Sequence, residues 1–364
     1  MQHSIIFKRE GHYSGMPNMQ ILPDGRLVAA ARVQTNAYHE PVGGWIAFES
    51  KDEGATWAQT DDPTIPYNWA GNQPREKMER IELIQPDGTY LCAGSVGSEY
   101  WPVERRAEAK ELGFKIQEHE LDNGLISVGG YKLFVARSSD RGKTWSRREW
   151  QMPGMAQVSG NRPPTFLEDG TILIHIYTTD IRADHYNYIW RSTDGGNTWR
   201  LHPMGTHTLS LYINETAMVE VSPGTILAHQ RVENIPQYLL ERWSYDGGIT
   251  WTDPLRTDIW GYPAHLLKLT DGRILCAHGH RREPGGIRAV LSSDGGVTWD
   301  LENTIVLRDD GGYPSNLKHG PGYPWGSDVG YPVSVQLGDQ SILTAYYITE
   351  SDGITHTATT RWKP

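Results

Sequence analysis

The stretch Ser292-Ser293-Asp294-Gly295-Gly296-Val297-Thr298-Trp299 decides the fold, because its pattern Ser-x-Asp-x-Gly-x-Thr-Trp occurs four more times in the 364 residues. Asp can accept hydrogen bonds from turn N–H groups, Gly supplies a positive φ, and Trp packs the turn onto its own sheet. Each copy follows an alternating or apolar run, so we predict hairpin turns whose aspartates are structural. These aspartate turns otherwise begin at Ser50, Ser138, Ser192 and Ser244.

A second repeated turn, usually Asp-Gly between apolar residues, precedes each aspartate turn. Repeats of about 50 residues with two hairpin turns are typical of a β-propeller with four-stranded blades. We therefore predict an all-β, six-bladed β-propeller of four-stranded antiparallel blades, forming a single domain over residues 1–364. The second turns are Asp24-Gly25, Asp87-Gly88, Asp169-Gly170, Pro223-Gly224, Asp271-Gly272 and an altered copy, Gly338-Asp339-Gln340.

Two segments fall outside the regular repeats. Residues 4–8 alternate like a strand before the first blade, and the last blade has room for three strands. We predict that this N-terminal strand pairs with residues 355–361 and closes the ring, which removes free edges. Residues 99–130 form a charged insertion in blade two. An insertion of that length is typical of a lid, a binding loop or a subunit contact.

Composition narrows the classes of partner. The net charge of −10 argues against nucleic acid or an anionic membrane. The opening residues lack a signal-peptide pattern and no apolar run is long enough to span a bilayer, so we expect a cytoplasmic protein. Cys92 and Cys276 occupy equivalent Leu-Cys-Ala positions and are expected to be buried and unpaired. We expect neither a cofactor nor a metal site, and the oligomeric state stays open.

Topology places the candidate site. All repeated turns share one face, so the starts of the inner strands and the junctions after the second strands share the opposite face, near the axis. Arginines, carboxylates, imidazoles and aromatic rings gather there, which is typical of a carbohydrate site. The candidates just before inner strands are Arg162, Glu215, Tyr262, Asp328 and Tyr331, and those at the junctions are Arg32, His39, Arg182, Arg231, His278, His280, Arg281 and Arg282.

The aspartate turns, known as Asp boxes, and this order of blades resemble the sialidase (neuraminidase) superfamily over the whole chain. The resemblance implies that Glu215 matches the catalytic glutamate and Tyr331 the tyrosine nucleophile of the family. It also implies that Arg231 is one of three arginines that bind a substrate carboxylate. Glu215 would take the phenol proton of Tyr331, as a tyrosine with an unperturbed pKa of about 10 requires near neutral pH.

Two positions depart from the family pattern. Residues 15–17 read Gly-Met-Pro where the family has Arg-Ile-Pro, and no aspartate lies between Arg32 and Asp52 to serve as the acid/base. The loop there offers Tyr38, His39 and Glu40 instead. His39 is the predicted proton donor, because its unperturbed pKa is near ~6.5. The third arginine of the trio is Arg281, Arg282 or Arg288.

Three functions are compatible with these residues. The first is a sialidase-like exo-glycoside hydrolase acting on a terminal acidic or deoxy sugar, with His39, Glu215 and Tyr331 as catalytic residues. The second is a His/Tyr-dependent polysaccharide lyase or rhamnosidase-type propeller enzyme acting on rhamnose–uronate linkages, in which His278, His280 and Arg282 would act. The third is a propeller that binds sugar without catalysis.

Overall fold

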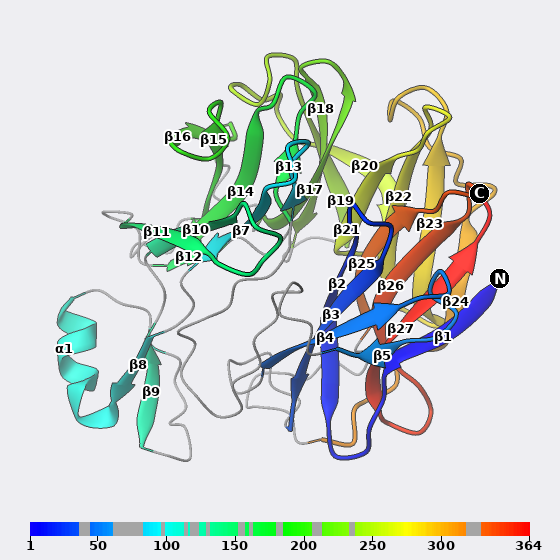
Figure 1. Ribbon diagram of the computed structural model, residues 1–364, viewed down its shortest axis with the longest axis horizontal. Helices are drawn as coiled ribbons and strands as arrows, with labels where there is room; N and C mark the ends of the chain where they lie inside the picture. The colour runs from blue at the N-terminus through cyan, green and yellow to red at the C-terminus, as the bar shows by residue number, and fades with distance from the viewer. Residues whose placement is uncertain are drawn as a thin grey trace.

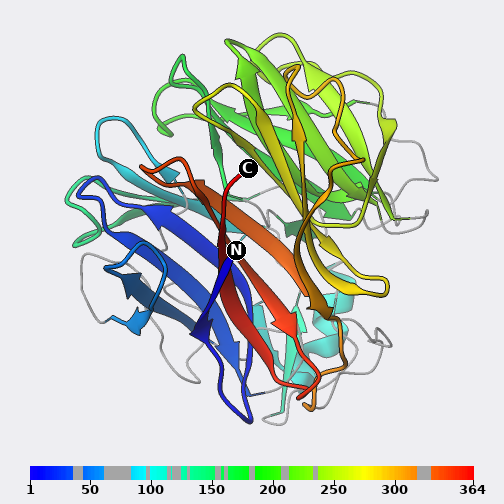
Figure 2. The same ribbon diagram turned by 90° about the vertical axis from the view of Figure 1, so that its right-hand side faces the viewer.

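The computed structural model describes residues 1–35, 44–60, 83–95, 99–112, 116, 124–128, 132–151, 157–159, 163–179, 185–205, 213–232, 237–317 and 329–364. Antiparallel sheets are arranged as six blades around an axis (Figures 1 and 2), as predicted. The innermost strands touch between blades three and four, four and five, five and six, and six and one, so the last blade of the ring meets the first.

The blades, given from the inner strand outward, follow the chain order. Blade one is β2 (Tyr13–Ile21), β3 (Leu27–Gln34), β4 (Gly44–Ser50) and β5 (Ala58–Gln59); blade two is β6 (Leu83–Ile84), β7 (Tyr90–Ser95), β10 (Lys132–Ser138) and β11 (Ser146–Gln151). Blade three has an inner strand in two pieces, β12 (Gln157–Ser159) and β13 (Thr165–Phe166), followed by β14 (Ile172–Thr179), β15 (His185–Ser192) and β16 (Arg200–Pro203).

The second half of the chain repeats the pattern. Blade four is β17 (Ile213–Ser222), β18 (Thr225–Val232), β19 (Tyr238–Ser244) and β20 (Leu255–Trp260); blade five is β21 (Ala264–Lys268), β22 (Ile274–His280), β23 (Gly285–Ser292) and β24 (Ile305–Gly311). Blade six is β25 (Val329–Gln336), β26 (Ile342–Thr349), β27 (Thr355–Trp362) and, from the N-terminus, β1 (Gln2–Phe7).

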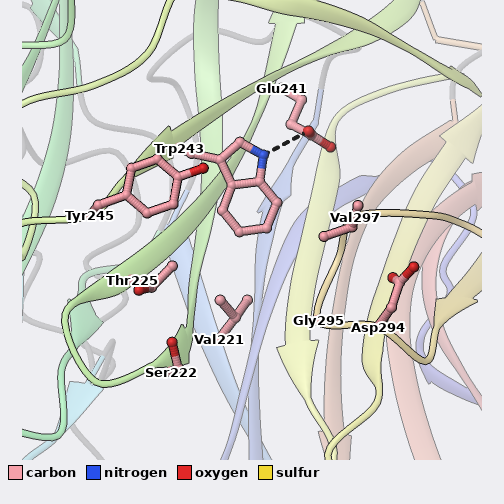
Figure 3. A pocket seen from close by; sticks show the side chains of 9 residues that line it. All are labelled: Val221, Ser222, Thr225, Glu241, Trp243, Tyr245, Asp294, Gly295 and Val297. Atoms are coloured by element: carbon pink, nitrogen blue, oxygen red, sulfur yellow. Dashed lines mark hydrogen bonds between the residues drawn. The ribbon is translucent and has the colours of Figure 1, made fainter.

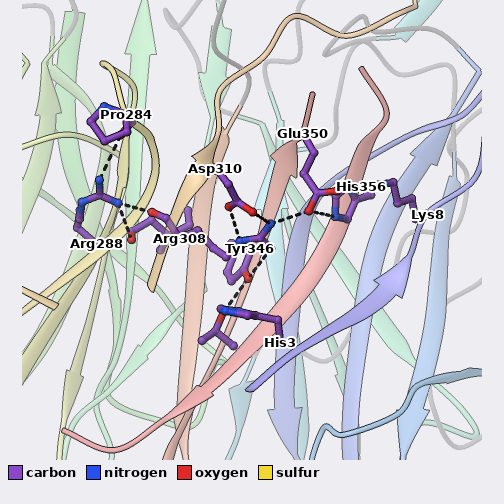
Figure 4. A network of polar contacts seen from close by, with 11 residues as sticks. His3, Lys8, Pro284, Arg288, Arg308, Asp310, Tyr346, Glu350 and His356 are labelled. Carbon is purple, nitrogen blue, oxygen red and sulfur yellow. Dashed lines mark hydrogen bonds and ion pairs between the residues drawn. The ribbon is translucent and has the colours of Figure 1, made fainter. Parts of the chain in front are cut away.

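The N-terminal strand closes the ring, which confirms the prediction. β1 pairs antiparallel with β27, from Gln2 opposite Arg361 to Phe7 opposite Thr357. Lys8, directly after β1, donates a hydrogen bond to Glu350 at 2.7 Å. Glu350 also accepts from Arg308 of blade five at 2.6 Å, within the polar network of Figure 4. The first strand is therefore held by backbone pairing and by charge.

The aspartate turns share one set of internal hydrogen bonds. In the turn quoted above, Ser292 donates to Asp294 at 2.7 Å, and the Thr298 N–H and hydroxyl donate to the same carboxylate at 2.9 and 2.6 Å. The Gly296 N–H donates to the Ser292 hydroxyl at 2.7 Å. The hydrogen bonds from Thr298 come first among the causes that lower the pKa of Asp294 to about 2. The carboxylate is thus committed to the turn, in agreement with a structural role.

The same turns also join adjacent blades. The second glycine of the turn at Ser292, Gly296, lies against Leu227 of blade four, and a Cβ there would be 2.5 Å from Leu227 Cδ2. Trp199 packs on its own sheet, stacked on Trp190 at 4.5 Å. It also packs against a cluster that blades two and three share. The corresponding glycine–leucine contacts are Gly54 with Leu343, Gly196 with Leu91 and Gly248 with Leu173.

The predicted insertion in blade two carries its own small structure. β8 (Glu99–Pro102) pairs with β9 (Leu125–Val128), and the 3-10 helix η1 (Val103–Arg105) and helix α1 (Arg106–Glu111) follow β8 (Figure 1). Within the described ranges, no helix has the length and apolarity needed to cross a bilayer. Cys92 and Cys276 are buried, as expected, and neither is part of a disulfide.

Candidate active site

β-bulges shape three inner strands at the end opposite the aspartate turns. The register shifts between Gly15 and Asn18 in β2, between Ile213 and Thr216 in β17, and between Gly330 and Val333 in β25. A bulge bends its strand and changes the direction of a side chain. The bulges in β2 and β25 contain Pro17 and Pro332, and a proline lacks the backbone N–H that regular pairing needs.

The bulges correct one expectation from the sequence. Glu215 and Tyr331 were expected just before inner strands, but both lie inside strands that begin two residues earlier. Tyr331 has a φ of +53°, an unusual value for a residue with a side chain. The inner strands begin early because the bulge lets pairing continue on both sides of these residues.

Glu215, Arg231 and Tyr331 form a cluster that joins blades four and six. The Tyr331 hydroxyl donates a short hydrogen bond to Glu215 Oε1, and Arg231 Nη1 donates to Glu215 Oε2 at 2.8 Å. The same Arg231 nitrogen lies 3.4 Å from the Tyr331 hydroxyl. Glu215 is 4% exposed, and a carboxylate buried to this extent needs a counter-charge such as that of Arg231.

The environment keeps the Tyr331 phenol protonated at rest. Burial raises the pKa of Tyr331 well above its usual value near 10, and the negative charge of Glu215 raises it further, while Arg231 opposes both effects. The phenol oxygen can therefore become a nucleophile when its proton passes to the Glu215 carboxylate at the moment of reaction. Their hydrogen bond supplies the path for that transfer.

A second arginine reaches the cluster across Tyr262. The guanidinium carbons of Arg231 and Arg281 lie 4.2 and 5.2 Å from the centroid of the Tyr262 ring. Arg281 is held in place because it donates to the Val329 carbonyl at 2.9 Å and to the Tyr347 hydroxyl at 3.3 Å. Both arginines thus lie against Tyr262 and contact the start of β25, Arg231 at Tyr331 and Arg281 at Val329.

Among the three candidates for the third arginine, the structure brings Arg281 to the cluster. Arg282 lies 4.1 Å from the ring centroid of Trp260 and donates to His280 Nε2 at 3.3 Å. Arg288 is buried and donates to the carbonyls of Arg308 and Pro284. The neighbours of these two arginines belong to blades four and five, away from Tyr331.

His278 and His280 point toward blade four. Gly279 between them packs against Gly330 of β25, and neighbouring side chains in a strand alternate between its faces. Burial lowers the pKa of His278 to about 3, so this ring is neutral at physiological pH. The His280 ring lies 5.1 Å from Trp260. The structure therefore groups His280 with Trp260 and Arg282 rather than with Tyr331.

The other predicted site residues divide into two groups. Arg32 in β3 is half-buried and lies opposite Gly15, next to the bulge of blade one. The second group, which lies outside the described residues, comprises His39, Arg162, Arg182 and Asp328.

One aromatic residue beside the cluster was not singled out from the sequence. Tyr13, at the start of β2, is 3% exposed and its ring lies 6.2 Å from that of Tyr347. Tyr347 in turn lies 5.9 Å from Tyr331. No pattern in the sequence singles it out, because the bulge that begins two residues later, at Gly15, becomes visible only in the strand pairing.

A six-bladed propeller with aspartate turns on one face and a Tyr–Glu–Arg cluster at the other end of its inner strands is a sialidase-type propeller. Residues 124–346 match the family described as BNR repeat-like domain, and the chain belongs to that family.

Individual relatives agree with this assignment. The chain is 22% identical over 255 residues to the anhydrosialidase of Macrobdella decora, covering 67% of this chain and 31% of that protein's length. A Dyadobacter fermentans protein of unknown function is 25% identical, with a TM-score of 0.77 and coverage of 99% and 97% of the two chains. The intramolecular trans-sialidase of Ruminococcus gnavus, solved with oseltamivir carboxylate, has a TM-score of 0.60 at 16% identity, with 98% and 96% covered.

Proposed function

We propose that this protein is a sialidase-like exo-glycoside hydrolase that acts on a terminal acidic sugar of an oligo- or polysaccharide. The observation that carries the proposal is the hydrogen bond from the Tyr331 phenol to Glu215, with Arg231 in contact with both groups. A half-buried phenol that donates to a carboxylate suits a nucleophile paired with its base.

The reaction would proceed in two steps. In the first, Tyr331 Oη bonds to the anomeric carbon while its proton passes to Glu215. The glycosidic bond breaks, and the leaving oxygen keeps the electron pair of that bond. It takes a proton from an acid, a role that we assign to His39. In the second step, water attacks the anomeric carbon and gives a proton back to His39, while the bond to Tyr331 breaks and Glu215 returns the proton to the phenolate.

The arginines support an acidic substrate. Arg231 and Arg281 both lie against Tyr262, beside the proposed nucleophile. Guanidinium groups bind carboxylates through charge-assisted hydrogen bonds with a planar geometry that matches the anion. A sugar carboxylate held there would place the adjacent ring over Tyr331.

Tyr331→Phe tests the proposal, because it removes the nucleophilic oxygen and keeps the ring. Turnover would be measured on chromogenic glycosides of N-acetylneuraminic acid, glucuronic acid and rhamnose. We expect activity on an acidic glycoside and a loss of roughly 10²-fold or more in Tyr331→Phe. Tyr313→Phe, which changes a tyrosine that is 47% exposed, is the matched control.

A fluorinated analogue of the accepted sugar should label Tyr331, as shown by peptide mass spectrometry. Wild-type turnover in Tyr331→Phe would overturn the nucleophile. Release of an unsaturated sugar that absorbs in the ultraviolet would favour the lyase instead.

A further inference from the structure

A cavity of about 450 Å³ lies between blades four and five, on the face of the aspartate turns (Figure 3). Its walls come from the β17–β18 hairpin, the end of β19 and the aspartate turn that begins at Ser292. Glu215 is the third residue of β17 and Ser222 is the last, so the cavity lies roughly 20 Å along this strand from the Tyr331 cluster. The two sites are therefore separate.

Two parallel aromatic rings line one wall of the cavity. Trp243 lies in β19, and Tyr245 follows directly after the end of that strand. Their rings are 6.3 Å apart with an angle of 5° between the planes. Glu241 accepts a hydrogen bond from Trp243 Nε1 at 2.7 Å, which fixes the indole plane. Tyr245 is 69% exposed, so its ring is available to a ligand.

Polar groups complete the cavity. The hydroxyls of Ser222 and Thr225 line it, and within the described part of the chain neither has a hydrogen-bond partner in the protein. Glu241 and Asp294 give the cavity negative charge. Hydrogen bonds from Thr298 come first among the causes that lower the pKa of Asp294 to about 2. Flat apolar rings beside hydroxyl groups suit a sugar ring, whereas the carboxylates repel an acidic one.

We propose that this cavity is a second carbohydrate site, which binds a neutral, disaccharide-sized segment of a glycan through the Trp243 and Tyr245 rings. It complements the arginine-rich cluster on the opposite face, which suits an anionic sugar. This cavity would hold the neutral part of a polysaccharide while, under the proposed function, the Tyr331 site cleaves an acidic sugar from an end of the same polysaccharide.

The test is ligand-observed saturation-transfer NMR on the full chain, with lactose, maltose and cellobiose as neutral probes and N-acetylneuraminic acid as the acidic probe. We expect at least one neutral disaccharide to bind in the millimolar range. Tyr245→Ala should weaken that binding by about tenfold, since it removes one stacking platform. Its exposure means that the variant should melt as the wild type does.

Two controls place the binding. Tyr313→Ala, which removes another exposed tyrosine, and Tyr331→Phe, which alters the opposite face, should both bind the disaccharide as the wild type does. The proposal is overturned if no neutral disaccharide binds, if Tyr245→Ala binds with unchanged affinity, or if Tyr331→Phe abolishes binding. The first two outcomes leave the hydrolase proposal intact, because that proposal rests on Tyr331.

Discussion

Replacing Gly296 with alanine tests the contact between adjacent blades. Gly296 has a φ of +98°, and an added Cβ would lie 2.5 Å from Leu227 Cδ2. Left-handed backbone costs a residue with a side chain about 1–2 kcal/mol. Forcing a methyl group into a packed site costs about 1–3 kcal/mol. We therefore expect Gly296→Ala to lower the free energy of unfolding by about 2–5 kcal/mol.

The neighbouring glycine supplies a matched control. Gly295 also has a positive φ, +77°, but a Cβ there would meet nothing within 4 Å. Gly295→Ala should therefore cost only the backbone term, about 1–2 kcal/mol. The difference between the two variants isolates the contact with Leu227.

Urea unfolding followed by far-ultraviolet circular dichroism measures both variants. In the background of Leu227→Ala, the Gly296→Ala substitution should cost no more than Gly295→Ala, because its steric partner has gone. Equal costs for the two glycine variants in the wild-type background would refute the reasoning. So would a double variant without coupling between positions 227 and 296.

Three other predictions concern the ring, the acid and the turns. Deleting residues 1–9 should expose the edge of β27 and cause aggregation or a loss of cooperative unfolding; a cooperative monomer, seen by light scattering and calorimetry, would contradict this. His39→Ala should lower turnover by roughly 10²-fold with folding intact, whereas near-normal rates alongside inactive His278 or His280 variants would favour the lyase. Hydrogen bonds from Thr298 lower the pKa of Asp294 to about 2, below the unfolded value near 3.8. Its stabilising effect is therefore complete above 3.8 and is lost as the pH falls through 2. The urea midpoint should drop less over that window in Asp294→Asn than in the wild type; equal drops would exclude the turn as a cause.

The aspartate turns could be predicted from the sequence because their hydrogen bonds join residues at most four positions apart. Repetition of such local units fixes the number of blades. The meeting of Glu215 with Tyr331, 116 residues later, was predictable from topology, since inner strands converge at the axis.

Other features depend on how distant strands fit together. The bulges are shifts in register between two strands, which one strand's residues do not reveal. The choice of Arg281 over Arg282 depends on the direction in which each side chain leaves the end of β22, and that direction is set by the packing of Gly279 on Gly330. The cavity with Trp243 and Tyr245 was missed because its walls come from two blades.

The glycine–leucine contacts between blades have a direction around the ring. In each contact, the aspartate turn of one blade packs over a leucine of the preceding blade. Lengthening such a turn would break its contact with the preceding blade, so insertions should be selected against on that face. The opposite ends of the strands also carry contacts between blades, such as Gly311 with Ile348, but the insertion with β8, α1 and β9 begins at that end. The face opposite the aspartate turns therefore accommodates an insertion, while the glycine–leucine contacts on the turn face help to keep the ring assembled.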